Sequence, residues 1–155
     1  MSNRARHERR PRQLKPDVSE AILFPEGLIG CPEWRQFALQ PGPPDSPVLR
    51  LQCVDDPSVC FVVIDPRHVR PDYDAALPVD QLLPLGLHSP NEGLLFCTVA
   101  ARGKPPVLTA NLLGPLVINP RLKLGRQLVL ADSGYSAQFP LGSALDDGQA
   151  VREAS

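Results

Sequence analysis

The sequence LTANLLGPLVINPRLKLGRQLVL, residues 108–130, decides the fold class of this chain. Its short runs of Leu, Val and Ile are too brief for stable helices and are typical of β-strands joined by tight turns. The segment also contains no nucleophile, no acid–base pair and no metal-ligand spacing. It therefore indicates a scaffold that binds other molecules rather than one that catalyses a reaction. The turn-forming residues that separate the runs are Asn111, Gly114, Pro115, Asn119, Pro120 and Gly125.

The rest of the chain repeats this pattern of short apolar runs. The 155 residues fit one domain, and the 19 prolines are spread from Pro11 to Pro140, where each removes a backbone donor and opposes a long helix. We predict a mainly β fold, a small antiparallel β-barrel of short strands with one or two short helical turns. Besides the strands of residues 108–130, strands are expected at residues 21–24, 36–40, 48–54, 59–64 and 94–101, with a last extended piece at 135–141.

Two segments are candidates for the short helical turns. Pro32 suits the first position of a helix, which would end before residue 36. Residues 78–85 can form about two turns before a second proline interrupts them. Such a helix would lie against the barrel, and we expect Val79, Leu82 and Leu83 to face inward.

The strand of residues 48–54 alternates apolar and polar side chains, which predicts one solvated face. The next strand contains CFVVI, residues 60–64, which is apolar throughout and is expected to be covered on both sides. The cysteines have no C-x-x-C pair and no histidine at zinc-finger spacing, so we expect no zinc site. Cys53, Cys60 and Cys97 lie in apolar runs and are predicted to be reduced packing residues.

The formal net charge of −1 hides two oppositely charged regions. Residues 1–16 hold six Arg or Lys against one Glu, a charge of +5, whereas residues 17–155 hold ten basic against 16 acidic residues, a charge of −6. We predict a basic disordered tail at 1–18, a barrel domain at 19–143 and a frayed tail at 144–155. The basic tail is either an arm for RNA or another polyanion, or a solvated extension of the domain.

Several classes of function are disfavoured by the residues present. No apolar run approaches the ~20 residues that cross a bilayer, and no signal peptide is recognisable, so a cytoplasmic protein is expected. The acidic stretch 65–80, with His68, lacks the spacing of a known metal motif. We interpret it as a solvated or partner-facing rim and expect no metal, no cofactor and no enzymatic activity.

Six pieces in one order resemble the flagellar assembly factor FliW family over about residues 22–140. Departures from the family pattern are Cys31, where an aromatic residue is usual, Ala110 in place of Val, and the basic tail. The matching pieces are FPEGLIG-x-x-x-W-x-x-F-x-L (24–39), LQCVDDPSVCFVVIDP (51–66), Tyr73, LPLGL (83–87), TANLLGPLVIN (109–119) and GRQLVL (125–130).

The resemblance implies a β-barrel that works through competing protein interfaces. FliW-like proteins bind CsrA, an RNA-binding translational regulator, and relieve its repression of flagellin mRNA. They also bind flagellin, so free flagellin withdraws them from CsrA. Because the two partners are mutually exclusive, the concentration of one controls the free amount of the other. This function needs surface area and no catalytic group, and we expect a monomer when no partner is bound.

Charge suggests which residues meet each partner. An RNA-binding regulator carries basic patches, so an acidic surface would assist the encounter. Flagellin would need an apolar groove, for which the connection at 111–119 is a hypothesis; these residues are also explained by ordinary turn chemistry. The candidates for CsrA are Asp55, Asp56, Asp65, Asp72 and Asp74, and those for flagellin are Asn111, Leu113, Pro115 and Asn119.

Two rival functions remain open. A nucleic-acid-binding β-barrel would use the basic N-terminal tail together with exposed aromatic side chains, although most aromatic residues occupy core-like positions. We expect no direct contact with nucleic acid, but the tail leaves this question open. A small β-barrel enzyme would have to use the acidic stretch and His68. Salt-dependent binding to RNA alone would favour the first rival, and loss of turnover on mutation of Asp65 or His68 would favour the second.

Overall fold

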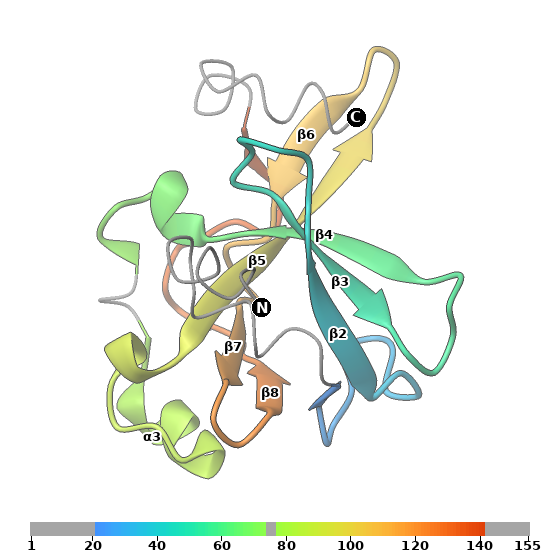
Figure 1. Ribbon diagram of the computed structural model, residues 1–155. Coiled ribbons are helices and arrows are strands. Elements are labelled where there is room, and N and C mark those ends of the chain that lie inside the picture. Colours follow the sequence, from blue (N-terminus) through green and yellow to red (C-terminus); the bar gives the residue numbers. More distant parts are fainter. Residues whose placement is uncertain (1–20, 74–76, 142–155) are drawn as a thin grey trace.

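The computed structural model describes residues 21–73 and 77–141 (Figure 1). The two predicted tails, 1–18 and 144–155, and the candidate Asp74 therefore lie outside the described residues. The strands are β1 (Ile22–Leu23), β2 (Gln36–Pro41), β3 (Leu49–Cys53), β4 (Cys60–Ile64), β5 (Leu94–Arg102), β6 (Val107–Ala110), β7 (Leu116–Asn119), β8 (Leu124–Gln127) and β9 (Phe139–Pro140). The short helices are η1 (Pro66–His68), α3 (Val79–Leu82), η3 (Leu83–Leu85) and η4 (Pro90–Glu92).

Seven of these strands close into a barrel, which confirms the predicted fold class. The strand order around the barrel is β4-β3-β2-β1-β8-β7-β5, and β5 returns to β4 through Val62↔Val99 and its neighbours. The pairs in this ring are antiparallel except for β1 with β8, which run parallel at Leu23↔Leu124. Strand β1 therefore joins the two halves of the barrel.

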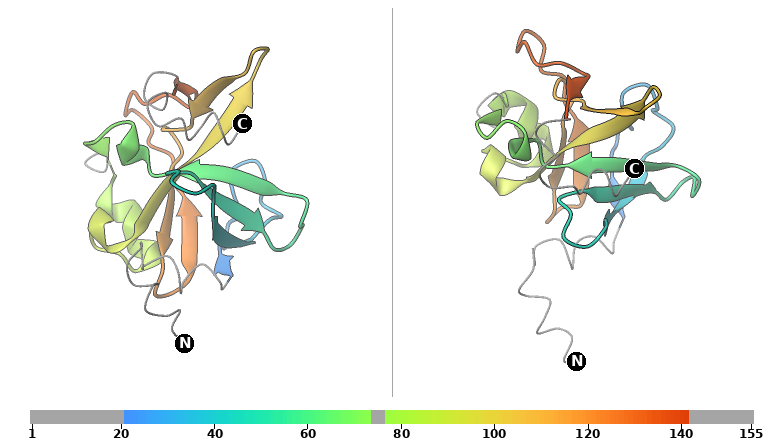
Figure 2. Two further views of the ribbon diagram at one scale, coloured as in Figure 1. Left: turned by 45° about the horizontal axis from the view of Figure 1, so that its top comes forward. Right: turned by 90° about the horizontal axis from the view of Figure 1, so that it is seen from above.

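The longest described strand, β5, extends beyond the barrel. Its first residues pair with β7 at Leu94↔Ile118, and its last residues pair with β6 at Arg102↔Val107. Strand β9 adds to the outer edge of β6. The resulting hairpin projects from the barrel, while the short helices gather on the side away from the β3–β4 turn (Figure 2).

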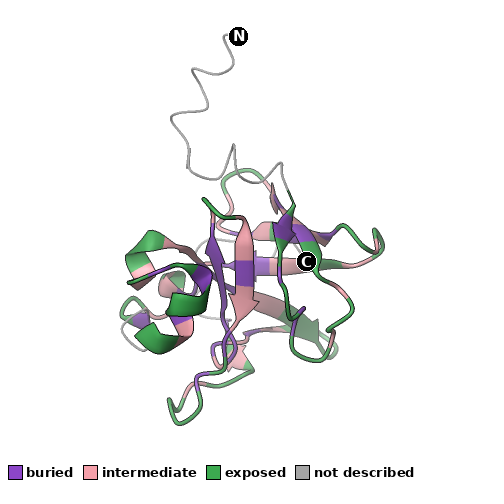
Figure 3. Ribbon diagram, turned by 90° about the horizontal axis from the view of Figure 1, so that it is seen from below, coloured by how far each residue is buried: buried purple, intermediate pink, exposed green. Residues whose placement is uncertain are grey.

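Successive residues along a strand point alternately into two apolar cores, one inside the barrel and one on its outer face. In β5, Phe96 packs inside the barrel, whereas Leu95 and Cys97 pack on its outer face beneath the helices and residues 128–141. Buried residues accordingly follow the strands, and exposed ones follow the helices and loops (Figure 3). The inner core contains Ile22, Phe24, Phe37, Leu39, Leu51, Cys53, Val63, Phe96, Leu116 and Ile118. The outer core includes Ile64, Tyr73, Leu82, Leu85, Leu87, Leu95, Cys97, Val117, Leu128 and Leu130.

The predicted inward face of residues 78–85 is wrong in part. Leu82 is buried as expected, but Val79 and Leu83 are each 50% exposed, and Leu85 faces the core instead. The α-helix lasts only four residues before the 3₁₀ turn that contains Pro84. A 3₁₀ turn has three residues per turn, so Leu82 and Leu85 share one face.

Two further local predictions are corrected. The segment from Pro32 forms no helix; it follows a tight turn closed by the bridge Leu28↔Cys31. In β4, Cys60 is exposed rather than packed, and only Val63 and Ile64 are fully covered. Pairing of β4 with β5 begins at Val62, because beyond Val99 strand β5 pairs with β6 and not with β4, so the start of β4 lacks a paired strand on this side.

Candidate functional site

Asp55 lies in the β3–β4 turn and is exposed. Its Oδ2 accepts hydrogen bonds from the backbone N–H of Arg35 at 2.8 Å and of Gln36 at 2.9 Å. These bonds, first from Gln36 and then from Arg35, hold the pKa of the Asp55 carboxyl below its ordinary value, because they favour the charged form. The side chain therefore stays ionised at neutral pH and ties the turn to the start of β2.

Asp56 stands next in the same turn. Its Oδ1 accepts the Ser58 hydroxyl at 2.7 Å and the Ser58 N–H at 3.1 Å. Both bonds, the hydroxyl first, lower the pKa of Asp56. The β3–β4 turn thus presents two adjacent carboxylates that are ionised at neutral pH and fixed in position by local hydrogen bonds.

The other acidic candidates lie elsewhere. Asp65 is half-buried at the start of η1, where its carboxylate accepts the Arg67 N–H at 2.9 Å and pairs with the Arg67 guanidinium at 2.8 Å. Asp72 is exposed beyond η1. The five residues of β4 separate Asp65 from the β3–β4 turn, a span of roughly 17 Å at ~3.3 Å per residue. The predicted acidic rim is therefore two separate groups.

The candidates for the flagellin contact serve mainly as turn residues. Asn111 Oδ1 accepts the N–H of Leu113 at 3.1 Å and of Gly114 at 2.9 Å. Pro115 is buried, although a contact with flagellin would need it exposed, and Asn119 is completely buried. Leu113 is half-buried. Of the four residues, Leu113 is thus the only one whose side chain is apolar and partly open to a partner.

Gln127 is a connecting residue that the sequence pattern did not identify. Its Oε1 accepts the Ile29 N–H at 2.8 Å, and its Nε2 donates to the Gly114 carbonyl oxygen at 2.9 Å. It therefore ties the 28–31 turn to the 111–115 connection. A glutamine at the end of a short strand carries no local signal for this role, because both of its partners are distant in sequence.

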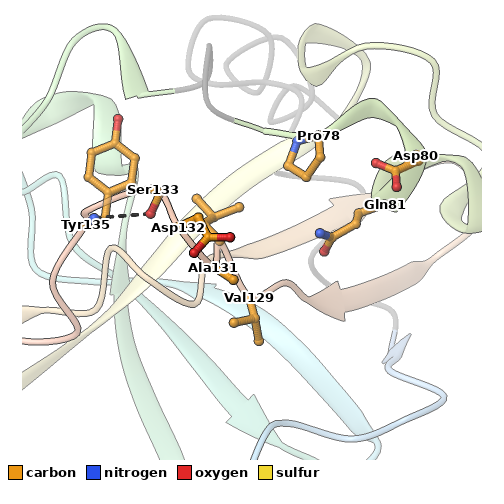
Figure 4. Close-up of a pocket in the computed structure, with 9 residues that line it drawn as sticks. Pro78, Asp80, Gln81, Val129, Ala131, Asp132, Ser133 and Tyr135 are labelled. Carbon is orange, nitrogen blue, oxygen red and sulfur yellow. Dashed lines mark hydrogen bonds between the residues drawn. The ribbon is translucent and has the colours of Figure 1, made fainter.

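Two hollows open on the side that carries the helices. The larger is about 440 Å³ and lies between α3 and residues 129–135 (Figure 4). In Figure 4, Asp132 lies between Tyr135 and the α3 residues Asp80 and Gln81. The Ser133 hydroxyl accepts the Tyr135 N–H at 3.1 Å, which shapes this wall.

The smaller hollow is about 270 Å³ and is mainly apolar. It lies where the turn after β1, the 3₁₀ helix η3 and strand β8 meet. An ion pair between Arg126 Nε and Glu26 Oε1, 3.4 Å apart, stands at its rim. The residues that line it are Pro25, Glu26, Pro84, Leu85, Leu124, Gly125 and Arg126.

Within residues 21–73 and 77–141, no three His, Cys, Asp or Glu side chains cluster so that they could hold a metal ion. Burial raises the pKa of the Cys97 thiol to about 12, so this buried cysteine is a poor nucleophile. No helix in the same residues is long and apolar enough to cross a membrane.

Comparison with known proteins gives a consistent result. Residues 6–141 match the FliW protein family. The flagellar assembly factor FliW of Syntrophus aciditrophicus is 37% identical over 123 residues, covering 79% of this chain and 78% of the relative. FliW 2 of Desulfotalea psychrophila is 33% identical over 125 residues, covering 81% and 82%. A crystal structure of the flagellar assembly factor FliW superposes with a TM-score of 0.70 at 29% identity, covering 79% of this chain and 86% of that one.

Proposed function

This chain belongs to the FliW family of flagellar assembly factors, and we propose that it acts by binding two proteins, the regulator CsrA and flagellin. Bound to CsrA, it would relieve repression of flagellin mRNA; bound to flagellin, it would be withdrawn from CsrA. The family match over residues 6–141 is the observation that carries this proposal. Its mechanism would be competition between binding partners and not catalysis.

The β3–β4 turn supports the CsrA half of the proposal. Asp55 and Asp56 are adjacent and held ionised by hydrogen bonds. A protein that binds RNA must carry basic groups, and opposite charges accelerate encounter and orient the complex. We therefore confine the proposed CsrA contact to Asp55 and Asp56. Asp65 is already paired with Arg67 at the far end of β4, and Asp72 follows η1 in the chain.

A gel-shift assay tests the function directly. CsrA is first bound to an RNA that carries the flagellin mRNA leader, and the purified full chain is then added. We expect it to release the RNA and expect added flagellin to restore the CsrA–RNA complex. The double variant Asp55→Lys/Asp56→Lys should lose the release. Asp80→Lys, an exposed acid on α3 across the barrel from the turn, should retain it.

Three other results of this assay would change the proposed function or the proposed CsrA contact. If the wild-type chain leaves the CsrA–RNA complex intact at low salt, the CsrA half of the proposal is wrong. If it shifts RNA without CsrA, and the shift weakens as salt is raised, the chain is a nucleic-acid-binding barrel. If the Asp55→Lys/Asp56→Lys variant still releases the RNA, as the Asp80→Lys control does, the proposed function stands and the CsrA contact lies on another surface.

A further inference from the structure

A row of exposed side chains crosses three neighbouring strands on the outer face of the barrel. Leu23 of β1 pairs with Gln36 of β2, and the N–H of Val54, just past β3, donates to the Gln36 carbonyl oxygen at 2.8 Å. Leu23 and Val54 are 40% and 49% exposed. Their chain neighbours Ile22 and Cys53 are buried inside the barrel, so both exposed side chains point outward. The row is therefore an apolar strip of sheet that the described helices and loops leave open.

The β3–β4 turn adds two carboxylates at one end of this row. Asp55 Oδ2 accepts the N–H of Gln36, which places this carboxylate beside the row, and Asp56 follows it in the turn. Among the residues that the structure describes, these are the only two acids adjacent in sequence, and neither forms an ion pair. The guanidinium of the exposed Arg35 lowers the pKa of Asp55 less than the two backbone hydrogen bonds do. The turn therefore keeps an excess of negative charge.

This combination of groups selects the chemistry of an occupant. Carboxylates whose positions are already fixed favour Arg or Lys side chains, because hydrogen bonds between ionised groups are the strong ones. The apolar strip beside them favours a chain segment laid across the sheet over an isolated ion. The surface therefore fits a basic polypeptide segment.

The chain itself holds such a segment directly before β1. Residues 1–16 carry a charge of +5, whereas residues 17–155 carry −6, so the domain is the polyanion nearest to its own N-terminal segment. The cations of the segment are Arg4, Arg6, Arg9, Arg10, Arg12 and Lys15.

The connection between this segment and the turn is short. The described residues begin at Ala21, one residue before β1. The register Leu23↔Gln36 places Ala21 two residues along the strand and one strand spacing away from Gln36, a distance of roughly 8 Å. Lys15 lies six residues before Ala21 and Arg12 nine, spans of at most about 20 and 30 Å. Both cations can therefore reach the two carboxylates of the same chain.

We propose that the basic segment of residues 9–15 binds this surface in cis, with its Arg and Lys side chains on the carboxylates of Asp55 and Asp56. The backbone of the segment lies across Leu23 and Val54. A short tether gives an effective concentration on the order of millimolar, so even a weak contact is occupied and a cationic partner must displace it. The docking needs no partner. Its consequence for CsrA rests on the proposed function, which assigns the same carboxylates to CsrA.

Nuclear magnetic resonance of the full-length, ¹⁵N-labelled chain tests the docking. The reporters are the backbone N–H groups of Arg35, Gln36 and Ser58, which donate to the two carboxylates. At about 0.01 M salt, the three signals should differ between the wild type and a tail variant without the four cations of residues 9–15. At about 1 M salt they should coincide, because exposed charges are then screened. The tail variant carries Arg9→Gln, Arg10→Gln, Arg12→Gln and Lys15→Gln.

A peptide added in trans locates the contact. The probe is a synthetic peptide of residues 1–16, titrated into the tail variant at low salt. It should move the three reporter signals until they saturate. With Asp55→Asn/Asp56→Asn added to the tail variant, the peptide should cause no shift of these signals. Asp80→Asn, which neutralises an exposed acid on α3, is the matched control and should leave the peptide's effect unchanged.

The outcomes separate this inference from the proposed function. If the reporter signals of the wild type and the tail variant coincide at low salt, the docking is wrong, whatever the gel-shift assay shows. If their difference grows with protein concentration, the segment binds a second copy and the cis assignment is wrong. If the peptide moves signals around Asp80 and not those of the turn, the surface is wrong. A chain that leaves CsrA bound to RNA would overturn the CsrA contact and leave the docking intact.

Discussion

The side chain of Asn119 donates its Nδ2–H to the carbonyl oxygen of Leu85 at 2.8 Å, so strand β7 holds the end of η3 from inside the fold. The same side chain accepts the N–H groups of Arg121 and Leu122 through Oδ1 at 3.0 and 3.3 Å. One buried amide therefore fixes both the β7–β8 turn and the end of η3, whose Pro84 and Leu85 line the 270 Å³ hollow.

Replacing Asn119 with Leu should destabilise the protein. The substitution leaves the Leu85 carbonyl and two turn N–H groups without their partner, and an unsatisfied buried group costs about 1–3 kcal/mol. Urea unfolding should show a loss of at least that size. Asn91→Ala, at an exposed position in η4, is the control and should stay within about 0.5 kcal/mol of the wild type. Equal midpoints for the two variants would contradict this account of Asn119.

Gly125 allows the Phe24 ring to pack inside the barrel. A Cβ on Gly125 would lie 2.5 Å from Cζ of that ring, too close for any real contact. Gly125→Ala should therefore lower the free energy of unfolding by about 1–3 kcal/mol through overpacking. In a Phe24→Leu background, the same change should cost less, because the clashing ring is gone. Strictly additive costs in this double-mutant cycle would show that the two residues do not interact.

Asp55 should contribute stability that depends on pH. Its pKa in the folded chain lies below the ordinary value of 3.8, so the contribution is present above pH 3.8 and is lost as pH falls through the lower, folded pKa. Asp55→Asn should accordingly be less stable than the wild type at neutral pH, and the difference should vanish in acid. Urea midpoints measured between pH 7 and pH 2 test this. A difference that is constant across this range would contradict the assignment.

Tyr73 should resist ionisation until the protein unfolds. It is completely buried, its hydroxyl donates to the Leu112 carbonyl, and burial raises its pKa well above the ordinary 10.0. Because the unfolded chain then loses this proton first, stability should fall as pH rises above about 10. Tyr135 is the chain's second tyrosine and is partly exposed. In a Tyr135→Phe variant, where Tyr73 is the remaining tyrosine, an alkaline absorbance titration should show tyrosinate only as the protein unfolds; tyrosinate in the folded protein would refute the prediction.

The four cysteines should react with a thiol reagent in an order set by burial. Cys60 is exposed and should be labelled first, followed by the partly covered Cys31. Cys53 and Cys97 are buried and should react only on unfolding, the latter also because its pKa is raised to about 12. Cys60→Ser should remove the fast phase alone. Mass spectrometry after brief labelling identifies the sites, and early modification of Cys97 would contradict the buried position.

Residue types and spacing were enough to predict the mainly β barrel, its turns and the β3–β4 hairpin, because short apolar runs and turn formers act locally. They did not reveal that Asn119 is buried. The local sequence around a turn asparagine is the same whether its side chain is exposed or bonds a carbonyl oxygen from a distant segment. They also could not show that η3 covers β8 but stops before Leu23. The parallel closure at Leu23↔Leu124 brings together segments about a hundred residues apart. The two carboxylates of the turn were therefore predictable from the sequence, whereas the hollow exists only because the chain closes into a barrel.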